Sequence, residues 1–260
     1  MLVVGVLVLL ISGGFGGYLM LTKEPFSTGQ PPLTPSPSVT ESAFVTPSPT
    51  PTVKPTTDPS KLKFAATGPG TYVYAKGKSA VFGTAGTLRK YRVAIETGTP
   101  VPIEEFTARV DETLSDERSW IGGKNVRLQR VSDNTHNFTV YLVTPGTAQR
   151  ICGNGGFDIF WRGEPYTSCR IGGQVLINIA RYLRGIPDYG APLADYQQYA
   201  INHEVGHALG HGHELCPKKG ALAPVMAQQT FGLYGCLANS WPYLDGKRYA
   251  GPPGRIVPSG

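Results

Sequence analysis

The chain has 260 residues, a formal net charge of +6 at pH 7 and 16% charged residues. Its basic residues are dispersed and no nucleic-acid-binding motif accompanies them, so the charge predicts a solvated basic surface and excludes nucleic acid as an expected partner. The chain is also not expected to fold as one globular domain over its whole length, because an apolar segment and a Pro/Ser/Thr-rich segment precede residue 61.

Residues 1–22 contain no charged side chain and are mostly apolar. About 20 apolar residues in a helix are enough to cross a bilayer, so we predict a transmembrane signal anchor here. A cleaved signal peptide is the alternative, although the segment lacks a basic start and a clear cleavage site. The expected location is the cell membrane, single-pass, with the rest of the chain extracytoplasmic, or secreted if the segment is cleaved.

Residues 23–60 are rich in Pro, Ser and Thr and poor in apolar side chains. Such a segment cannot bury enough surface to offset its ordering entropy, so we predict a disordered linker. Residues 61–260 are long enough for a single domain with its own core, and we expect this domain to be extracytoplasmic.

Hydrophobic periodicity predicts the elements of this domain in chain order. Alternation and β-branched residues predict strands, and apolar spacings of three and four predict helices. The expected strands are 90–98, 126–131, 138–144, 156–163 and 174–180, the expected helices are 103–120 and 193–209, and a further N-terminal hairpin is expected within 64–88. This order favours an α+β fold in which two main helices pack on a mixed sheet of about four to five strands.

The domain has four cysteines, an even number that favours disulfides outside the cytosol. We predict the pairs Cys152–Cys169 and Cys216–Cys236, because each closes a short loop in a Gly-rich stretch. Cysteine ligation of a structural metal is the alternative, but no CxxC spacing supports it.

Four of the five histidines lie within "HEVGHALGHGH", which starts at His203. Histidines four residues apart stack on one helix face, so His203 and His207 can bind one metal ion. Glu204 would lie beside the metal, where a carboxylate suits a general base acting on water. A chance match, or a former enzyme that has lost activity, is the alternative.

Two histidines compete for the third ligand position. On an unbroken helix His211 would lie about 12 Å along the axis from His203, too far for both to bind one ion. Gly210 is the residue best suited to end the helix, and His213 then has room to turn back. A distant glutamate ligand is nearly excluded, since no Glu follows Glu214. We therefore predict a zinc site of His203, His207 and His213.

The motif HExxHxxGxxH resembles that of the metzincin metallopeptidases, which also carry a methionine in a tight turn beneath the zinc. Met226, in "APVMAQQ", matches that Met-turn. The chain is also similar to an uncharacterised actinobacterial family of membrane-anchored or secreted proteins with this motif. The resemblance spans about 91–241. Metzincins usually have a helix after the Met-turn, whereas glycines and prolines leave little room for a long one here.

The resemblance implies a metzincin-like zincin fold and a zinc metallopeptidase. Zinc would activate a water molecule, and Glu204 would transfer its proton to the leaving amine. The substrate would be a peptide or protein, bound as an added strand at the sheet edge, which we expect near 157–161. A zinc amidase acting on cell-wall peptide and a non-catalytic zinc-containing surface-binding domain are the alternatives. The sequence leaves the oligomeric state and the cleavage preference open.

Overall fold

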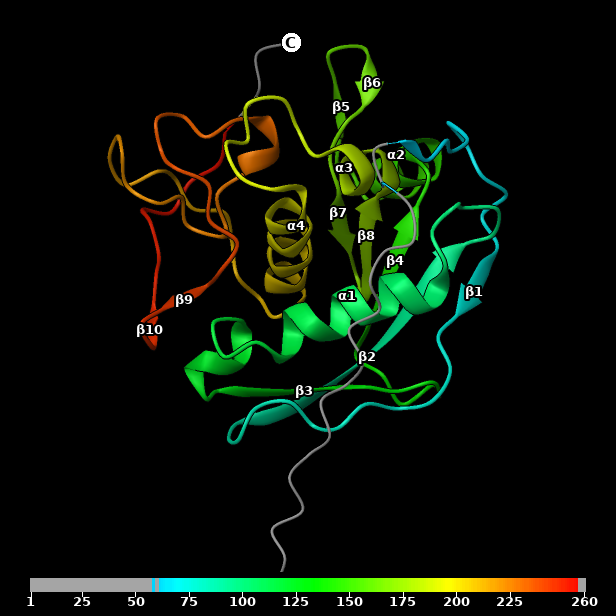
Figure 1. Ribbon diagram of the computed structural model, residues 1–260, viewed down its shortest axis with the longest axis horizontal. Helices are drawn as coiled ribbons and strands as arrows, with labels where there is room; N and C mark the ends of the chain where they lie inside the picture. The colour runs from blue at the N-terminus through cyan, green and yellow to red at the C-terminus, as the bar shows by residue number, and fades with distance from the viewer. Residues whose placement is uncertain (1–57, 59–60, 257–260) are drawn as a thin grey trace, which may run out of the picture. The chain divides into compact units, whose positions relative to one another are not determined.

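The computed structural model describes Asp58 and residues 61–256 (Figure 1). The predicted anchor, residues 1–22, lies outside the described residues, and so does all of the predicted linker except Asp58.

The predicted single-pass location at the cell membrane needs correction. No helix within the described residues is both long and apolar enough to cross a bilayer. Single-pass anchoring therefore has no support from the structure.

The domain has a mixed α+β fold, which confirms the predicted class. Its helices are α1 (Ile103–Ser115), α2 (Pro145–Asn154), α3 (Ile179–Arg184) and α4 (Leu193–Ala208), with the 3-10 helices η2 (Trp120–Gly123) and η3 (Gln229–Phe231). The main strands are β1 (Tyr72–Tyr74), β2 (Thr87–Glu96), β3 (Val126–Arg130), β4 (Phe138–Val143), β7 (Cys169–Ile171) and β8 (Gln174–Asn178). Two small hairpins pair β5 (Phe160–Trp161) with β6 (Glu164–Pro165) and β9 (Tyr243–Leu244) with β10 (Lys247–Arg248).

Six strands form the main sheet in the order β1-β2-β4-β8-β7, with β3 also paired to β2. The strands β2, β3, β4 and β8 run parallel, whereas β1 and β7 are antiparallel to their neighbours. The central strands β4 and β8 are buried almost throughout, as expected for strands covered on both faces. The strand β7 pairs only with β8 and forms one edge of the sheet.

Several predicted elements differ from the structure. The helices α2 and α3 were not predicted, because both are too short to show a clear helical periodicity. Instead of an N-terminal hairpin within 64–88, the strand β1 pairs with β2. Residues 157–161 do not form the sheet edge either, since β5 belongs to a separate hairpin and β7 occupies that edge.

The helix α4 packs against β7, β8, α1 and α3. Figure 1 shows it between the strands of the sheet and the segment after residue 210, drawn in orange to red. Ten of its residues are buried, including Tyr196, Tyr199 and Val205 in the main hydrophobic core. No α-helix follows α4 in the described residues, in agreement with the glycines and prolines there. A rigid, centrally packed helix thus carries the first two histidines of the motif.

Both disulfides predicted from the sequence are present. Cys152 on α2 bonds to Cys169 on β7, and Cys216 bonds to Cys236 across a separation of 20 residues. The first bridge ties α2 to the edge strand of the sheet. The second closes the loop that contains Met226, and thereby restrains the segment that passes beside α4.

A buried glutamate, Glu96, joins three segments at the end of β2. Its carboxylate accepts hydrogen bonds from the backbone and hydroxyl of Thr144 at 2.8 and 2.9 Å, from the hydroxyl of Thr147 at 2.7 Å and from the backbone of Gly70 at 2.8 Å. Burial by itself would raise the pKa of Glu96, but these hydrogen bonds outweigh it and hold the pKa below its ordinary value. The ionised carboxylate therefore stabilises the fold.

We predict that Glu96→Gln lowers the free energy of unfolding by about 2 kcal/mol at neutral pH, because an amide cannot accept all four hydrogen bonds. The folded pKa is depressed, so this stabilisation is fully present above the unfolded pKa of about 4.3 and is lost as the pH falls through the folded pKa. Urea unfolding of both proteins between pH 3 and 7 measures the difference. The exposed Glu117→Gln is the control; an equal effect there would contradict the assignment.

We also predict that replacing Cys216 and Cys236 together by Ser lowers the free energy of unfolding by about 3 kcal/mol, because the unfolded chain gains loop entropy. Non-reducing peptide mapping checks the pairing in the native protein. A crosslink between Cys152 and Cys216, or free thiols in the folded chain, would be inconsistent with the structure.

Candidate metal centre

His203 and His207 lie one turn apart on α4 and are held by backbone carbonyl groups. Nδ1 of His203 is 2.8 Å from the carbonyl oxygen of Val225, and Nδ1 of His207 is 2.8 Å from that of His211. A carbonyl oxygen only accepts, so each Nδ1 carries the proton and each Nε2 keeps its lone pair. Such hydrogen bonds to the far nitrogen are typical of metal-binding histidines.

As predicted, the helix ends shortly after His207, because α4 runs to Ala208 and the left-handed Gly210 follows. Gly210 has a φ of 98°, a conformation that side chains with a Cβ rarely adopt. The backbone N–H of His211 donates to Gly206 at 3.0 Å, and that of Gly210 donates to His207 at 3.1 Å. This is the Schellman pattern, which satisfies the last carbonyls of a helix while the chain reverses direction.

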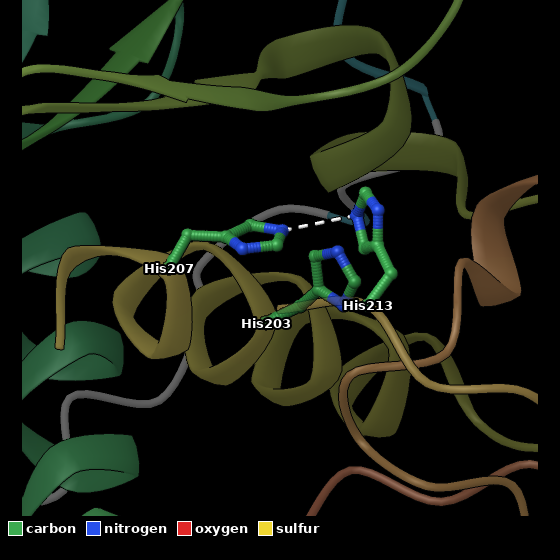
Figure 2. Close-up of side chains that lie close together, drawn as sticks. All are labelled: His203, His207 and His213. Carbon is green, nitrogen blue, oxygen red and sulfur yellow. Dashed lines mark hydrogen bonds between the residues drawn. The ribbon is translucent and has the colours of Figure 1, made fainter. Parts of the chain in front are cut away.

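The reversal brings His213 back to the face of α4 that carries the other two imidazoles. Figure 2 shows the three rings converging. Nε2 of His213 is 3.0 Å from Nε2 of His207, and one nitrogen from each ring lies within 4.8 Å of the others. Two nitrogens bound tetrahedrally to zinc at about 2.0–2.1 Å are about 3.3 Å apart, so the arrangement suits one ion of that kind.

The backbone around His213 is fixed by two distant segments. The N–H of Glu214 donates to the carbonyl of Met226 at 3.1 Å, and the carbonyl of His213 accepts from Gly254 at 3.1 Å. The carboxylate of Glu214 forms an ion pair with Arg248 at 2.7 Å. These contacts place the third histidine although it lies on a loop and not on the helix.

All three imidazoles have pKa values below the ordinary value of 6.5. Burial is the largest cause in each, followed for His203 by the charges of His207 and His213. The pKa of His213 falls to about 4, to which His207 and the cationic Arg255 also contribute. The rings are therefore neutral at pH 7, the form in which imidazole binds metals.

Glu204 lies beside the histidines with a carboxyl group that has no partner. Its side chain is 4% exposed, and its Oε2 makes no hydrogen bond within the described residues. Burial raises its pKa to about 8. A buried carboxyl without a partner destabilises a fold, so its presence calls for a functional explanation.

Met226 is fully buried and packs against α4 between the two helical histidines. A Cβ on Gly206 would collide with Sδ of Met226 and with the ring of Trp120, so this position admits only glycine without a shift of its neighbours. The hydroxyl of Tyr199 donates to the carbonyl of Ala227 at 3.0 Å and fixes the same turn. The sequence indicated Met226, but nothing in it marked Gly206 as a contact point.

His211 does not join the other three histidines. Its ring stacks on Trp120, with centroids 4.3 Å apart and planes inclined by 19°. Its contribution to the site is its backbone carbonyl, which accepts from His207. The sequence could not reveal this contact, because it depends on the path of the chain after Gly210.

A cleft of about 340 Å³ opens beside the histidines. It is lined by Phe157, Cys169, Arg170, Glu204, His207, Gly210, His211, Gly212 and His213. Its walls are therefore the edge strand β7 and the end of α4. A substrate in this cleft would lie next to both Glu204 and the imidazoles.

Among known proteins, a family model described as "Protein of unknown function (DUF3152)" matches residues 58–243. The match covers most of the chain, so the chain belongs to this family. No curated protein and no solved structure matches it.

We predict that His213→Ala weakens zinc binding by more than about 100-fold, because it removes a ligand of the ion. Loss of a group that only orients a ligand typically weakens metal binding by about 10–100-fold. His211→Ala should weaken binding by less than about tenfold, since alanine keeps the backbone carbonyl that orients His207. Competitive titration of the full-length proteins against a chromophoric chelator measures both affinities. The reverse ranking would rule out His213 as the third ligand.

Proposed function

From the site of this DUF3152 family member, we propose a zinc-dependent metallopeptidase that hydrolyses peptide bonds with water. The observation that carries this proposal is Glu204, a buried carboxyl without a hydrogen-bond partner that faces the same cleft as the imidazoles of His207 and His213. A metal site that only stabilises the fold has no use for such a group, whereas hydrolysis requires a base at this place.

The donor set favours zinc as the metal. Three neutral imidazoles are typical of catalytic zinc sites, which leave a further position open, whereas Mg²⁺ and Ca²⁺ prefer oxygen ligands. His203, His207 and His213 would hold the ion, with Val225 and the carbonyl of His211 orienting the first two rings. Bound zinc supplies a Lewis acid that activates water and polarises a carbonyl group.

Glu204 would act as the general base and then as the general acid. It takes a proton from the attacking water and later delivers it to the amine that leaves. Burial raises the affinity of this carboxyl for a proton, which suits delivery to the leaving amine. The positive charge of a bound zinc ion would lower that affinity again and favour the ionised form that accepts a proton from water. The fixed position of Glu204 on α4 removes the need to reorganise the site during the reaction.

The resemblance to metzincins supports the same proposal. The helix that carries His203, the turn at Gly210 and the buried Met226 beside α4 would correspond to the zinc helix and the Met-turn of that class. The edge strand β7 lines the cleft and pairs on one side only, so its free side would accept an extended peptide. We therefore assign the substrate edge to β7 in place of residues 157–161.

We predict that Glu204→Gln keeps stoichiometric zinc but lowers kcat for peptide hydrolysis by about 100-fold or more, because an amide cannot accept the proton. Elemental analysis measures the zinc, and mass spectrometry of a diverse peptide library measures cleavage with and without a chelator. The exposed Glu104→Gln is the control and should match the wild type. Loss of zinc in Glu204→Gln, or near wild-type turnover, would refute the assigned role.

A further inference from the structure

Arg170 is the one arginine that lines the candidate cleft. It lies at the centre of the edge strand β7, between Cys169 and Ile171. Successive side chains of a strand point to opposite faces, and both of these neighbours pack in the small core beside α2. Arg170 therefore points to the other face, where it lines the cleft together with Glu204, His207 and His213.

The guanidinium of Arg170 has no partner in the part of the chain that the structure describes. Its Nε is buried without a hydrogen bond, and none of the ion pairs or hydrogen bonds among these residues involves the group. Arg181 and Arg92 also have an unbonded Nε, but each bonds through another guanidinium nitrogen. Arg170 differs from both, because none of its guanidinium nitrogens forms a hydrogen bond within the described residues.

The charges around the cleft favour an anion. Arg248 lies near the histidines but is neutralised by Glu214, whereas Arg170 has no such counter-ion. Glu204 has the only acidic side chain among the lining residues, and a bound divalent metal would add further positive charge. A cleft with this balance attracts negatively charged ligands.

We propose that Arg170 binds a carboxylate of the substrate, so that the site selects peptides with an acidic group close to the bond that is cleaved. The inference rests on the proposed peptidase function. A guanidinium presents paired N–H donors that match a carboxylate in a bidentate arrangement. The half-exposed ring of Phe157, which also lines the cleft, offers apolar contact to the rest of the ligand.

Two parts of a peptide carry this chemistry, an acidic side chain and the C-terminal carboxylate. Peptides with an internal Glu, the same peptides with Gln, and each of these with a free or an amidated C-terminus separate the two sources. The proteins to compare are the full-length wild type, Arg170→Gln, Arg170→Lys and Arg162→Gln. Arg162→Gln is the matched control, because this substitution removes the same charge from the preceding β5–β6 turn. Arg162 does not line the cleft.

The expected result is a fall in kcat/KM of about 30-fold or more for acidic peptides in Arg170→Gln, with neutral peptides changed by less than about threefold. For acidic peptides, the kcat/KM of Arg170→Lys should lie between those of the wild type and Arg170→Gln. Lysine keeps the positive charge but loses the bidentate geometry. Arg162→Gln should match the wild type. Equal losses on acidic and neutral peptides, or an equal loss in Arg162→Gln, would overturn the proposal.

A binding measurement separates failure of this proposal from failure of the peptidase function. Calorimetric titration measures the affinity for the same peptides in Glu204→Gln and in the double variant Glu204→Gln/Arg170→Gln. The Glu204→Gln background is used because it should not cleave the peptides. Tighter binding of acidic peptides that disappears with Arg170→Gln would support the carboxylate site even if the wild type cleaves nothing. Equal binding of acidic and amide peptides would reject it even if the wild type is an active peptidase.

Discussion

The reversal of the chain at Gly210, just after the end of α4, is the constraint on which the candidate site depends. A helix carries residues away from one another by about 1.5 Å per position, so a third ligand can reach the first two only if the helix stops soon after His207. The left-handed glycine stops it there and satisfies the last carbonyls with the Schellman hydrogen bonds. The same reversal brings the carbonyl of His211 to Nδ1 of His207. One turn thus places a ligand and orients another.

The remaining parts of the site are held by segments distant in sequence. The loop with Val225 and Met226 supplies the acceptor for His203 and packs against Gly206, and the Cys216–Cys236 disulfide closes that loop. Gly254 supports His213 through a hydrogen bond to its carbonyl, and Pro252 accepts another from the nearby Leu215. Because these supports are packed or crosslinked, the imidazoles have little freedom to rearrange, which is the property that a catalytic metal site requires.

The cleft combines a buried carboxyl with an unpaired guanidinium, which come from different elements of the fold. Glu204 comes from α4 and Arg170 from β7, and neither has a partner within the described residues. Groups of this kind destabilise a fold when nothing is bound, so both suit roles that are fulfilled only when a ligand is present. The proposed base and the proposed carboxylate site follow from the same physical argument, applied to opposite charges.

The sequence by itself determined the features that depend on local chemistry. The period of α4 put His203 and His207 on one face, Gly210 marked the end of the helix, and short loops selected the cysteine pairs. Strand alternation located β3, β4 and β8 within one or two residues. These features could be predicted because helical rise, glycine conformation and strand alternation act over a few neighbouring positions.

Only the tertiary structure decided which side chains meet across the chain. Three contacts join residues that are far apart in sequence. They are the four hydrogen bonds to Glu96, the packing of Met226 on Gly206 and the stacking of His211 on Trp120. The edge position of β7, and with it the place of Arg170 in the cleft, also follows from how the strands are ordered in the sheet. No local pattern carries this information, because burial and pairing between distant segments depend on the packing of the whole domain and not on the residues beside each position.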